Sequence, residues 1–386
     1  MCLKGLFEIM RKVIPSYCKN FKCIADKCND NCCIGWGIYI DDDTAEFYKN
    51  VSGEFGERLK KEINFGDENY FMLNENDRCP FLNKNNLCDI ITNLGEEHIC
   101  DICDKHPRFF EWFHDVTEMG VGLCCEEACR LLFKDSEPIT FETVIEPGEP
   151  DNEDYDEYFY EQLLRARKIL FAIAQNRNYT LQKRLILMPA MALDIQKCID
   201  NDDFELLEVV NTQYTAWTFC DRLHNYITVN QKEFDVKKYL TQFLGLIENL
   251  IPINEEWDIH LKNVISKIDD IADNYSVFLE YYKDRMYEYE HLLVYFIYRY
   301  FMKTVFDYDA LSKVKFAVIG YLTIIIFDVY TWLENNREFT MNDRIENVKM
   351  YSKDIEYAQL NIDDLAQQGY TNDILSFENL IGILSQ

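Results

Sequence analysis

Basic residues are scarce in this sequence. Its 386 residues include 39 Lys and Arg against 68 Asp and Glu, which gives a formal net charge of −29 at pH 7. A chain with this charge repels a phosphate backbone and lacks the basic patches that hold nucleic acid. The composition therefore excludes nucleic acid as the expected partner.

Long apolar runs are also missing. The longest candidate, residues 316–327, is bounded closely by Lys315 and Asp328, whereas a membrane-spanning helix needs about 20 apolar residues. We interpret this segment as a buried core helix and expect no membrane span. The first residues are mixed in character and lack the apolar run and small-residue cleavage site of an export signal. We therefore expect a cytoplasmic protein.

Cysteine, in contrast, is abundant. Of the 15 cysteines, thirteen lie at or before Cys129. Because the cytosol keeps thiols reduced, dense cysteine in an intracellular protein indicates metal or redox chemistry rather than a disulfide framework. Cys2, Cys198 and Cys220 stand apart, and we interpret them as small buried or incidental residues.

The charge pattern predicts two domains. Residues 136–161 carry ten acidic and no basic side chains, and Pro138, Pro147 and Pro150 interrupt any regular helix there. We therefore expect a metal-binding domain over residues 1–135, an acidic linker over 136–154 and a second domain over 155–386.

The two predicted domains differ in fold. Beyond the boundary, apolar residues recur at helical spacing around residues 163–170, 240–247 and 292–302. Before it the sequence is rich in turn residues, and alternating strand patterns are scarce throughout. The predicted fold class is mostly α, with an irregular cysteine-rich domain followed by an all-helical domain.

The cysteines fall into three sets along the chain. The first set places four thiols within eleven positions, ending in the adjacent pair Cys32 and Cys33. Thiolates select zinc, cuprous copper or iron–sulfur clusters. The spacing alone leaves zinc and iron open, and it also leaves open whether Cys32 and Cys33 bind one centre or two. The three sets are Cys23, Cys28, Cys32 and Cys33; Cys79, Cys88, Cys100 and Cys103; and Cys124, Cys125 and Cys129.

These segments resemble a known family. Residues 14–17 (Ile-Pro-Ser-Tyr) and 21–36 are similar to the opening of the flagellin lysine-N-methylases, and also to a wider group of zinc- or iron-chelating proteins named for a CxxCxxCC pattern. Here the gaps are four and three residues instead of two and two. The resemblance to the methylases continues in residues 290–301 and 351–357, and it covers most of the chain.

The resemblance implies a protein-lysine N-methyltransferase that uses S-adenosylmethionine, carries a [4Fe–4S] cluster and acts on flagellin. It implies that Cys100, Cys124 and Cys129 are additional to the metal ligands. The implied ligands are Cys23, Cys28, Cys32, Cys33, Cys79, Cys88, Cys103 and Cys125.

The sequence also contains candidates for a catalytic base and for a cofactor pocket. Methylation needs a neutral lysine amine, and Tyr17, Glu290 and Glu356 lie in the matched motifs as candidate bases. Trp36 and Arg108 flank cysteines and are candidates for the cofactor pocket, although packing against the metal site explains them equally well. The alternative function is a metal-chelating binding or carrier protein, with zinc or iron, that has no methyltransferase activity.

Overall fold

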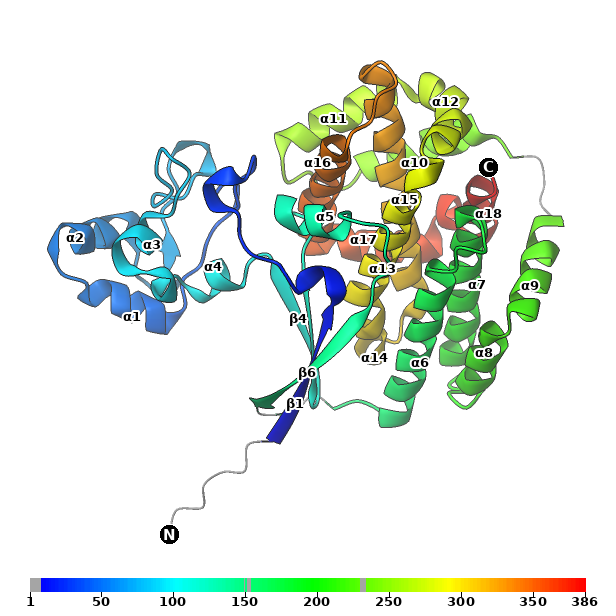
Figure 1. The fold of residues 1–386 in the computed structure, drawn as a ribbon, viewed down its shortest axis with the longest axis horizontal. Helices are drawn as coiled ribbons and strands as arrows, with labels where there is room; N and C mark the ends of the chain where they lie inside the picture. The colour runs from blue at the N-terminus through cyan, green and yellow to red at the C-terminus, as the bar shows by residue number, and fades with distance from the viewer. Residues whose placement is uncertain (1–7, 149, 151–153, 230–233) are drawn as a thin grey trace, which may run out of the picture. The chain divides into compact units, whose positions relative to one another are not determined.

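A computed structural model gives the fold (Figure 1) and describes residues 8–148, 150, 154–229 and 234–386. The chain forms two compact units. Unit 1 comprises Met1–Leu131 and Glu142–Glu149, and unit 2 comprises Leu132–Phe141 and Pro150–Gln386.

The stretch expected to be a linker is shared between the units. Strand β6 (Phe141–Gly148) joins the sheet of unit 1, although it contains Pro147. Proline is tolerated there because β6 is an edge strand, where one side of the backbone needs no ladder partner. Residues 149 and 151–153 of the expected linker lie outside the described residues.

Unit 1 is not as irregular as predicted, because it contains a four-stranded sheet in the order β4-β5-β1-β6. β4 (Arg108–Phe113) and β5 (Val116–Val121) form an antiparallel hairpin, and β1 (Glu8–Pro15) pairs with β5 in parallel. β4 reads Arg-Phe-Phe-Glu-Trp-Phe, so its aromatic residues fall on both faces and hide the alternation that would predict a strand.

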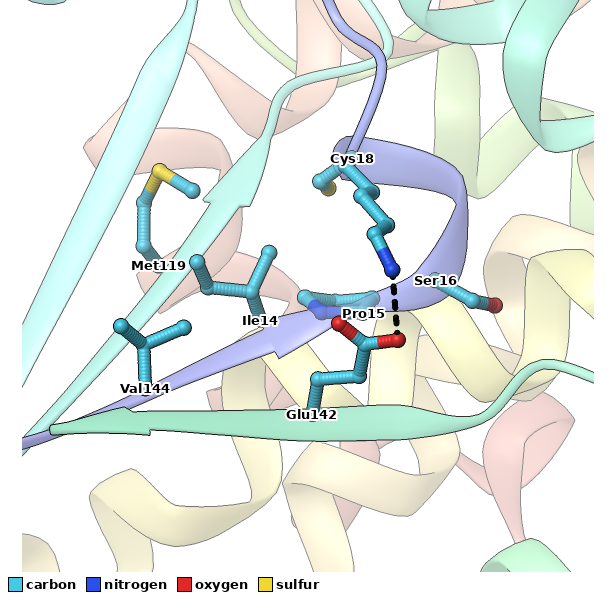
Figure 2. A pocket seen from close by; sticks show the side chains of 8 residues that line it. Ile14, Pro15, Ser16, Cys18, Met119, Glu142 and Val144 are labelled. Atoms are coloured by element: carbon cyan, nitrogen blue, oxygen red, sulfur yellow. Dashed lines mark hydrogen bonds and ion pairs between the residues drawn. The ribbon is translucent and has the colours of Figure 1, made fainter.

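A cavity of about 210 Å³ lies beside this sheet (Figure 2). Lys19 and Glu142 pair across it, with 2.9 Å between Nζ and Oε1. The other lining residues are mostly apolar: Ile14, Pro15, Ser16, Cys18, Met119 and Val144.

The rest of unit 1 is built from short elements around a small core. Tyr48, Leu59 and Phe81 are fully buried at its centre, and the Tyr48 hydroxyl donates to the His98 carbonyl at 2.6 Å. The elements are α1 (Asp42–Asn50), α2 (Gly53–Glu62), β2 (Ile63–Asn64), β3 (Tyr70–Phe71), α3 (Asp89–Leu94), α4 (Asp101–Lys105) and α5 (Glu126–Leu132), the last of which ends at the unit boundary.

From Glu157 onward, the described regular elements of unit 2 are helices, which confirms a mostly helical protein. They are α6 (Glu157–Ala174), α7 (Leu181–Asp200), α8 (Leu206–Thr215), α9 (Trp217–Val229), α10 (Val236–Glu248), α11 (Glu255–Ser266), α12 (Ile268–Tyr281), α13 (Tyr287–Tyr300), α14 (Thr304–Asp307), α15 (Ala310–Glu334), α16 (Met341–Tyr351), a π-helix (Ser352–Glu356), α17 (Gln359–Thr371) and α18 (Phe377–Leu384), with short 3₁₀ turns between some of them.

Helix α15 forms the core of unit 2. It is long and apolar enough to cross a membrane by length and composition, but 83% of its most apolar window is buried inside the protein. Helices α7, α12, α13, α16 and α17 pack against it. A helix that is apolar on all sides is stable in a folded protein only when neighbours cover it, which confirms the interpretation of residues 316–327 as a core helix.

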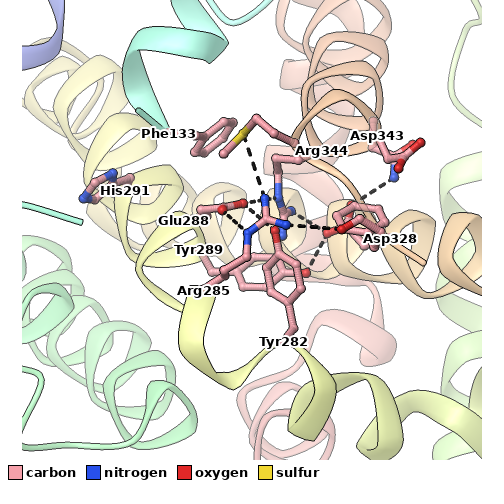
Figure 3. Close-up of polar contacts among 12 residues, drawn as sticks. Phe133, Tyr282, Arg285, Glu288, Tyr289, His291, Asp328, Asp343 and Arg344 are labelled. Carbon is pink, nitrogen blue, oxygen red and sulfur yellow. Dashed lines mark hydrogen bonds and ion pairs between the residues drawn. The ribbon is translucent and has the colours of Figure 1, made fainter. Parts of the chain in front are cut away.

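Buried ion pairs tie three of these helices together (Figure 3). The Arg344 side chain of α16 is fully buried, with 2.9 Å from its Nε to Glu288 Oε2 and 2.5 Å from its Nη1 to Asp328 Oδ2. Burial raises the pKa of Asp328, and the Arg344 charge opposes that rise. Tyr289 and Asn347 donate to the same carboxylate at 2.6 and 2.9 Å.

Replacing Arg344 with Met should destabilise unit 2 by about 3–5 kcal/mol, because Asp328 would then be buried without a cation and Glu288 would keep only Arg285 as an ion-pair partner. Urea unfolding followed by circular dichroism measures this loss. The matched control is Lys197→Met, which removes an exposed pair with Asp194 and should cost less than about 1 kcal/mol. Equal losses in the two variants would contradict the assignment.

Candidate functional site

Five thiols gather in the small core of unit 1. Cys79 and Cys100 are buried members of this core, and Cys33, Cys88 and Cys103 pack against it. The backbone N–H of Cys79 donates to the Cys33 carbonyl at 2.8 Å, which draws two distant segments together. We call this set the inner thiol group: Cys33, Cys79, Cys88, Cys100 and Cys103.

A second set of thiols lies around the start of α5. Glu126, which is buried, accepts the backbone N–H of Asn29 at 2.7 Å and lies 3.6 Å from Cys28 Sγ. This carboxylate therefore fixes the Cys28 turn next to Cys125, which precedes it in the chain. Cys23 and Cys32 are close enough to act electrostatically on Cys125 and help raise its pKa, although burial is the main cause. We call this set the outer thiol group: Cys23, Cys28, Cys32 and Cys125.

Burial disfavours the thiolate form of several thiols in both groups. Burial raises the pKa of Cys79 and of Cys125 to about 11 and that of Cys28 to about 12. In the inner group, a hydrogen bond with Cys100 is the main cause that raises the pKa of Cys103. Metal ions bind the thiolate form, so metal binding at these positions would release protons.

The thiols gather without converging on one point. Within the described parts of the chain, no three His, Cys, Asp or Glu side chains are arranged to hold a single metal ion. A [4Fe–4S] cluster takes one cysteine at each of its four irons, so its ligands stand apart. By chemical type, these thiols are the ligands that such a cluster takes.

The cysteines that were not predicted as metal ligands lie in several different places. Cys100 lies beside Cys103 in the inner thiol group, and its interpretation as additional to the metal ligands stays a prediction. Cys129 is fully buried, 3.1 Å from the Leu123 carbonyl, and Cys124 Sγ lies 3.9 Å from His106 Nε2. Cys198 and Cys220 are buried in unit 2 as predicted. Cys2 lies outside the described residues.

The predicted cofactor-pocket residues make local contacts in unit 1. Trp36 packs against the core that holds the inner thiol group, and its indole N–H donates to the Cys32 carbonyl at 2.8 Å. Arg108 donates to the Asp104 carbonyl at 2.9 Å, and its guanidinium lies 5.2 Å from the centre of the Phe21 ring. Both side chains therefore pack around the cysteine segments, and their role in a cofactor pocket stays a prediction.

The candidate base Tyr17 also lies in unit 1. It is buried in a short 3₁₀ turn, Ser16–Cys18. Burial raises the pKa of the neighbouring Cys18 thiol to about 12, and a hydrogen bond from Tyr17 opposes this rise. Tyr17 therefore lies in the chain between Ser16 and Cys18, two residues that line the cavity of Figure 2.

Glu290 and Glu356 lie in unit 2, and both side chains are fully buried rather than solvated as helix carboxylates usually are. Both oxygens of Glu290 are engaged by arginine. Its Oε2 lies 2.7 Å from Arg184 Nη1, and its Oε1 lies 2.9 Å from Arg177 Nη2. This double ion pair leaves neither oxygen of Glu290 without a partner.

Glu356 differs because only one of its oxygens is engaged. Oε1 accepts from the Tyr295 hydroxyl at 2.9 Å, from the Tyr300 hydroxyl at 2.9 Å and from Arg299 Nη1 at 3.0 Å. Oε2 is buried and has no hydrogen-bond partner among the described residues, and the same holds for the nearby Tyr351 hydroxyl. Burial raises the pKa of Tyr351, and the charge of Glu356 adds to the rise. One acceptor atom of Glu356 is therefore available inside unit 2.

The three donors to Glu356 were missed in the sequence because residues 292–302 were interpreted only as a helix with apolar residues at helical spacing. Their signal was present: Tyr295, Arg299 and Tyr300 are spaced by four and one, which places the first two on one face of α13. The π-helix that carries Glu356 follows α16 directly. Such short π segments occur frequently at functional sites.

Comparison with known proteins decides the family. The model of the FliB lysine N-methylase C-terminal domain matches residues 167–383, more than half of the chain. The chain belongs to the FliB lysine N-methylase family. Glu290, Glu356 and the donors to Glu356 lie within the range shared with FliB, whereas both thiol groups lie before it.

The sequence identity between this FliB-family chain and individual curated relatives is low. It is 23% identical over 142 residues to the lysine-N-methylases of Salmonella choleraesuis and Salmonella typhimurium, a stretch covering 34% of this chain and 35% of each relative. It is 24% identical over 134 residues to the flagellar biosynthetic protein FliU of Salmonella muenchen, covering 31% of this chain and 76% of FliU. No solved structure matches the chain.

The thiols of this FliB-family protein should differ in reactivity when no metal is bound. Cys23 and Cys32 are exposed, whereas Cys100 and Cys129 are fully buried. Brief treatment of the folded protein with iodoacetamide should alkylate the first pair and leave the second pair unmodified, because access limits the reaction. Peptide mass spectrometry measures the modification, and an unfolded sample is the control in which all four should react. Rapid alkylation of Cys100 in the folded protein would contradict its place in the core.

Proposed function

We propose that this chain is a protein-lysine N-methyltransferase that acts on flagellin with S-adenosylmethionine as the methyl donor. The observation that carries the proposal is the match to the FliB lysine N-methylase C-terminal domain over residues 167–383. The relatives named lysine-N-methylase support lysine as the acceptor, and the flagellar name of FliU supports a flagellar protein as the substrate.

The reaction requires a neutral amine. The lysine ammonium, with an ordinary pKa of about 10.4, must lose a proton before its nitrogen can attack. The nitrogen lone pair then forms a bond to the donor methyl carbon while the bond from that carbon to the sulfonium sulfur breaks. The products are the methylated lysine, S-adenosylhomocysteine and the released proton.

Glu356 is the best placed of the candidate bases. Its Oε2 has no partner among the described residues, whereas both Glu290 oxygens are engaged by arginine. The donors on Oε1 hold the carboxylate in one orientation. In this proposal, Glu356 accepts the amine proton, and Tyr295, Arg299 and Tyr300 act as positioning residues.

The proposed metal cofactor is a [4Fe–4S] cluster held by thiols of unit 1, with zinc as the alternative. When bound, such a cluster with one open iron position would supply an anchor for the amino and carboxylate groups of the donor. The supporting observation is the gathering of nine thiols into the inner and outer groups.

The gathered thiols also support the second candidate, a metal carrier without transferase activity. Both candidates bind metal, so only the fate of flagellin lysines separates them.

The anaerobically purified full chain should be incubated with unmodified flagellin and S-adenosylmethionine, and the masses of tryptic flagellin peptides measured. Lysine masses should rise by whole methyl increments, and samples without the donor should not change. Unchanged masses in the complete reaction would favour the carrier.

Glu356→Gln should lower kcat by about 10²–10⁴-fold, because a glutamine cannot accept the amine proton. The matched control is Glu346→Gln, which replaces an exposed carboxylate that pairs with Lys349 and should leave kcat unchanged.

A pH series separates a base from a residue that only stabilises the fold. As the pH approaches the ordinary lysine pKa of about 10.4, the amine loses its proton to solvent and needs no base. The activity of Glu356→Gln should therefore approach that of the parent protein as the pH rises. A deficit that stays constant over the whole pH range would contradict the role of base.

A further inference from the structure

Three buried oxygens of unit 2 lack hydrogen-bond partners in the short segment from the end of α16 to the end of the π-helix. They are the Tyr351 hydroxyl, Ser352 Oγ and Glu356 Oε2, and none has a partner among the described residues. Tyr351, Ser352 and the side chain of Glu356 are all fully buried. Buried polar atoms are almost always paired with a protein group, a water or a ligand. This segment therefore offers hydrogen bonds that the described chain does not fill.

The Tyr351 hydroxyl and Glu356 lie in one neighbourhood. The charge of Glu356 adds to the rise that burial causes in the pKa of Tyr351. Tyr300, whose hydroxyl donates to Glu356 Oε1 at 2.9 Å, is also close enough to Tyr351 to interact with it electrostatically. The Tyr351 hydroxyl and Glu356 Oε2 are not hydrogen-bonded to each other. Both oxygens are therefore able to accept from one donor group placed between them.

The walls of this neighbourhood are aromatic. The ring centre of Phe296 lies 5.8 Å from that of Tyr351, and the ring centre of Phe316 lies 4.9 Å from that of Tyr300. A Cβ at Gly320 would lie 3.2 Å from the Tyr351 hydroxyl and 2.8 Å from the Phe296 ring, so this glycine leaves the hydroxyl its place. Aromatic faces attract cations and pack well against methylene groups. A carboxylate and a hydroxyl among such rings suit an alkylammonium group.

A cavity of about 100 Å³ in unit 2 leads toward these side chains. Tyr300 lines the cavity, and its hydroxyl contacts the Glu356 carboxylate. The cavity also has charged lining residues. Lys313 pairs with the exposed Asp307 at 2.5 Å, and Lys303 Nζ lies 5.9 Å from the centre of the Tyr300 ring. The cavity therefore connects exposed residues with a side chain that touches the carboxylate.

We propose that Tyr351 is a positioning residue for the acceptor lysine, whose ammonium group enters by this cavity and donates to Glu356 Oε2 and to the Tyr351 hydroxyl. An ammonium carries three donors and no acceptor, which complements two oxygens that lack donors. One proton passes from the ammonium to Glu356. The nitrogen then forms its bond to the donor methyl while the bond from that methyl to the sulfonium sulfur breaks. The inference rests on the proposed function and adds the site that holds the amine.

Binding of n-butylamine tests the site without methyl transfer, because this ion has the methylenes and the ammonium group of a lysine side chain. The full chain is titrated with n-butylamine at neutral pH and binding is followed by ligand-observed nuclear magnetic resonance. Tyr351→Phe should weaken binding about tenfold, since a hydrogen bond to a charged group is lost. Butyltrimethylammonium has no N–H donor and should bind the parent protein more weakly than n-butylamine. Equal binding of the two ions, or no binding of n-butylamine, would overturn the inference.

The matched control is Tyr239→Phe. Tyr239 is another buried tyrosine of unit 2 whose hydroxyl has no partner among the described residues. Neither substitution removes a hydrogen bond within the described chain, so both variants should fold as the parent protein does. Tyr239→Phe should bind n-butylamine as the parent does, and an equal loss of binding in the two variants would contradict the assignment to Tyr351.

The kinetics of flagellin methylation give a second readout. Tyr351→Phe should raise KM about tenfold and leave kcat nearly unchanged, because it removes a contact made in the bound state and in the transition state alike. A parent protein that methylates flagellin while Tyr351→Phe changes neither KM nor n-butylamine binding would overturn the inference and leave the proposed function standing. A parent protein that binds n-butylamine through Tyr351 but does not methylate flagellin would overturn the proposed function and leave the amine site standing.

Discussion

Three helices of unit 2 meet at one buried guanidinium. Arg344 of α16 lies between Glu288 of α13 and Asp328 of α15, and all three side chains are fully buried. A buried charge is tolerated only while its counter-charges stay in place, so these pairs fix how the three helices are rotated and shifted against each other. The donors to Glu356 come from α13, and Glu356 itself follows α16. The geometry of the carboxylate therefore depends on Arg344.

Much of the helical part could be predicted from the sequence, because helix formation there follows local apolar spacing. Residues 240–247 lie in α10, residues 292–300 in α13, and residues 316–327 in α15. The sheet could not be predicted in the same way. β1 pairs in parallel with β5, about a hundred residues away, and a local pattern carries no information about such a partner. The burial of Glu290 and Glu356 was missed for the same reason, since their arginine partners include Arg177 and Arg299, 113 and 57 positions away.

The candidate metal ligands could also be predicted only in part from the sequence. The density of cysteine was visible in the sequence, and the resemblance to the family implied a set of eight thiols. The sequence did not reveal that Cys33 is joined to Cys79 through the backbone, or that Glu126 holds the Cys28 turn. These contacts arise only when segments up to about a hundred residues apart pack together. Cys100 entered the inner thiol group on the same basis, through the core that it shares with Cys79.

The π-helix at Ser352–Glu356 has a consequence for how this chain can vary. A π-turn accommodates one more residue than an α-turn in the same stretch of helix. Removing a single residue there would let the segment close as an ordinary α-helix, with the residues on either side kept near their present orientation. Adding one more residue would instead rotate the residues after it by about 100° around the helix axis, and the carboxylate of Glu356 would then point away from Tyr295, Arg299 and Tyr300. This segment should therefore tolerate the loss of one residue better than the gain of one.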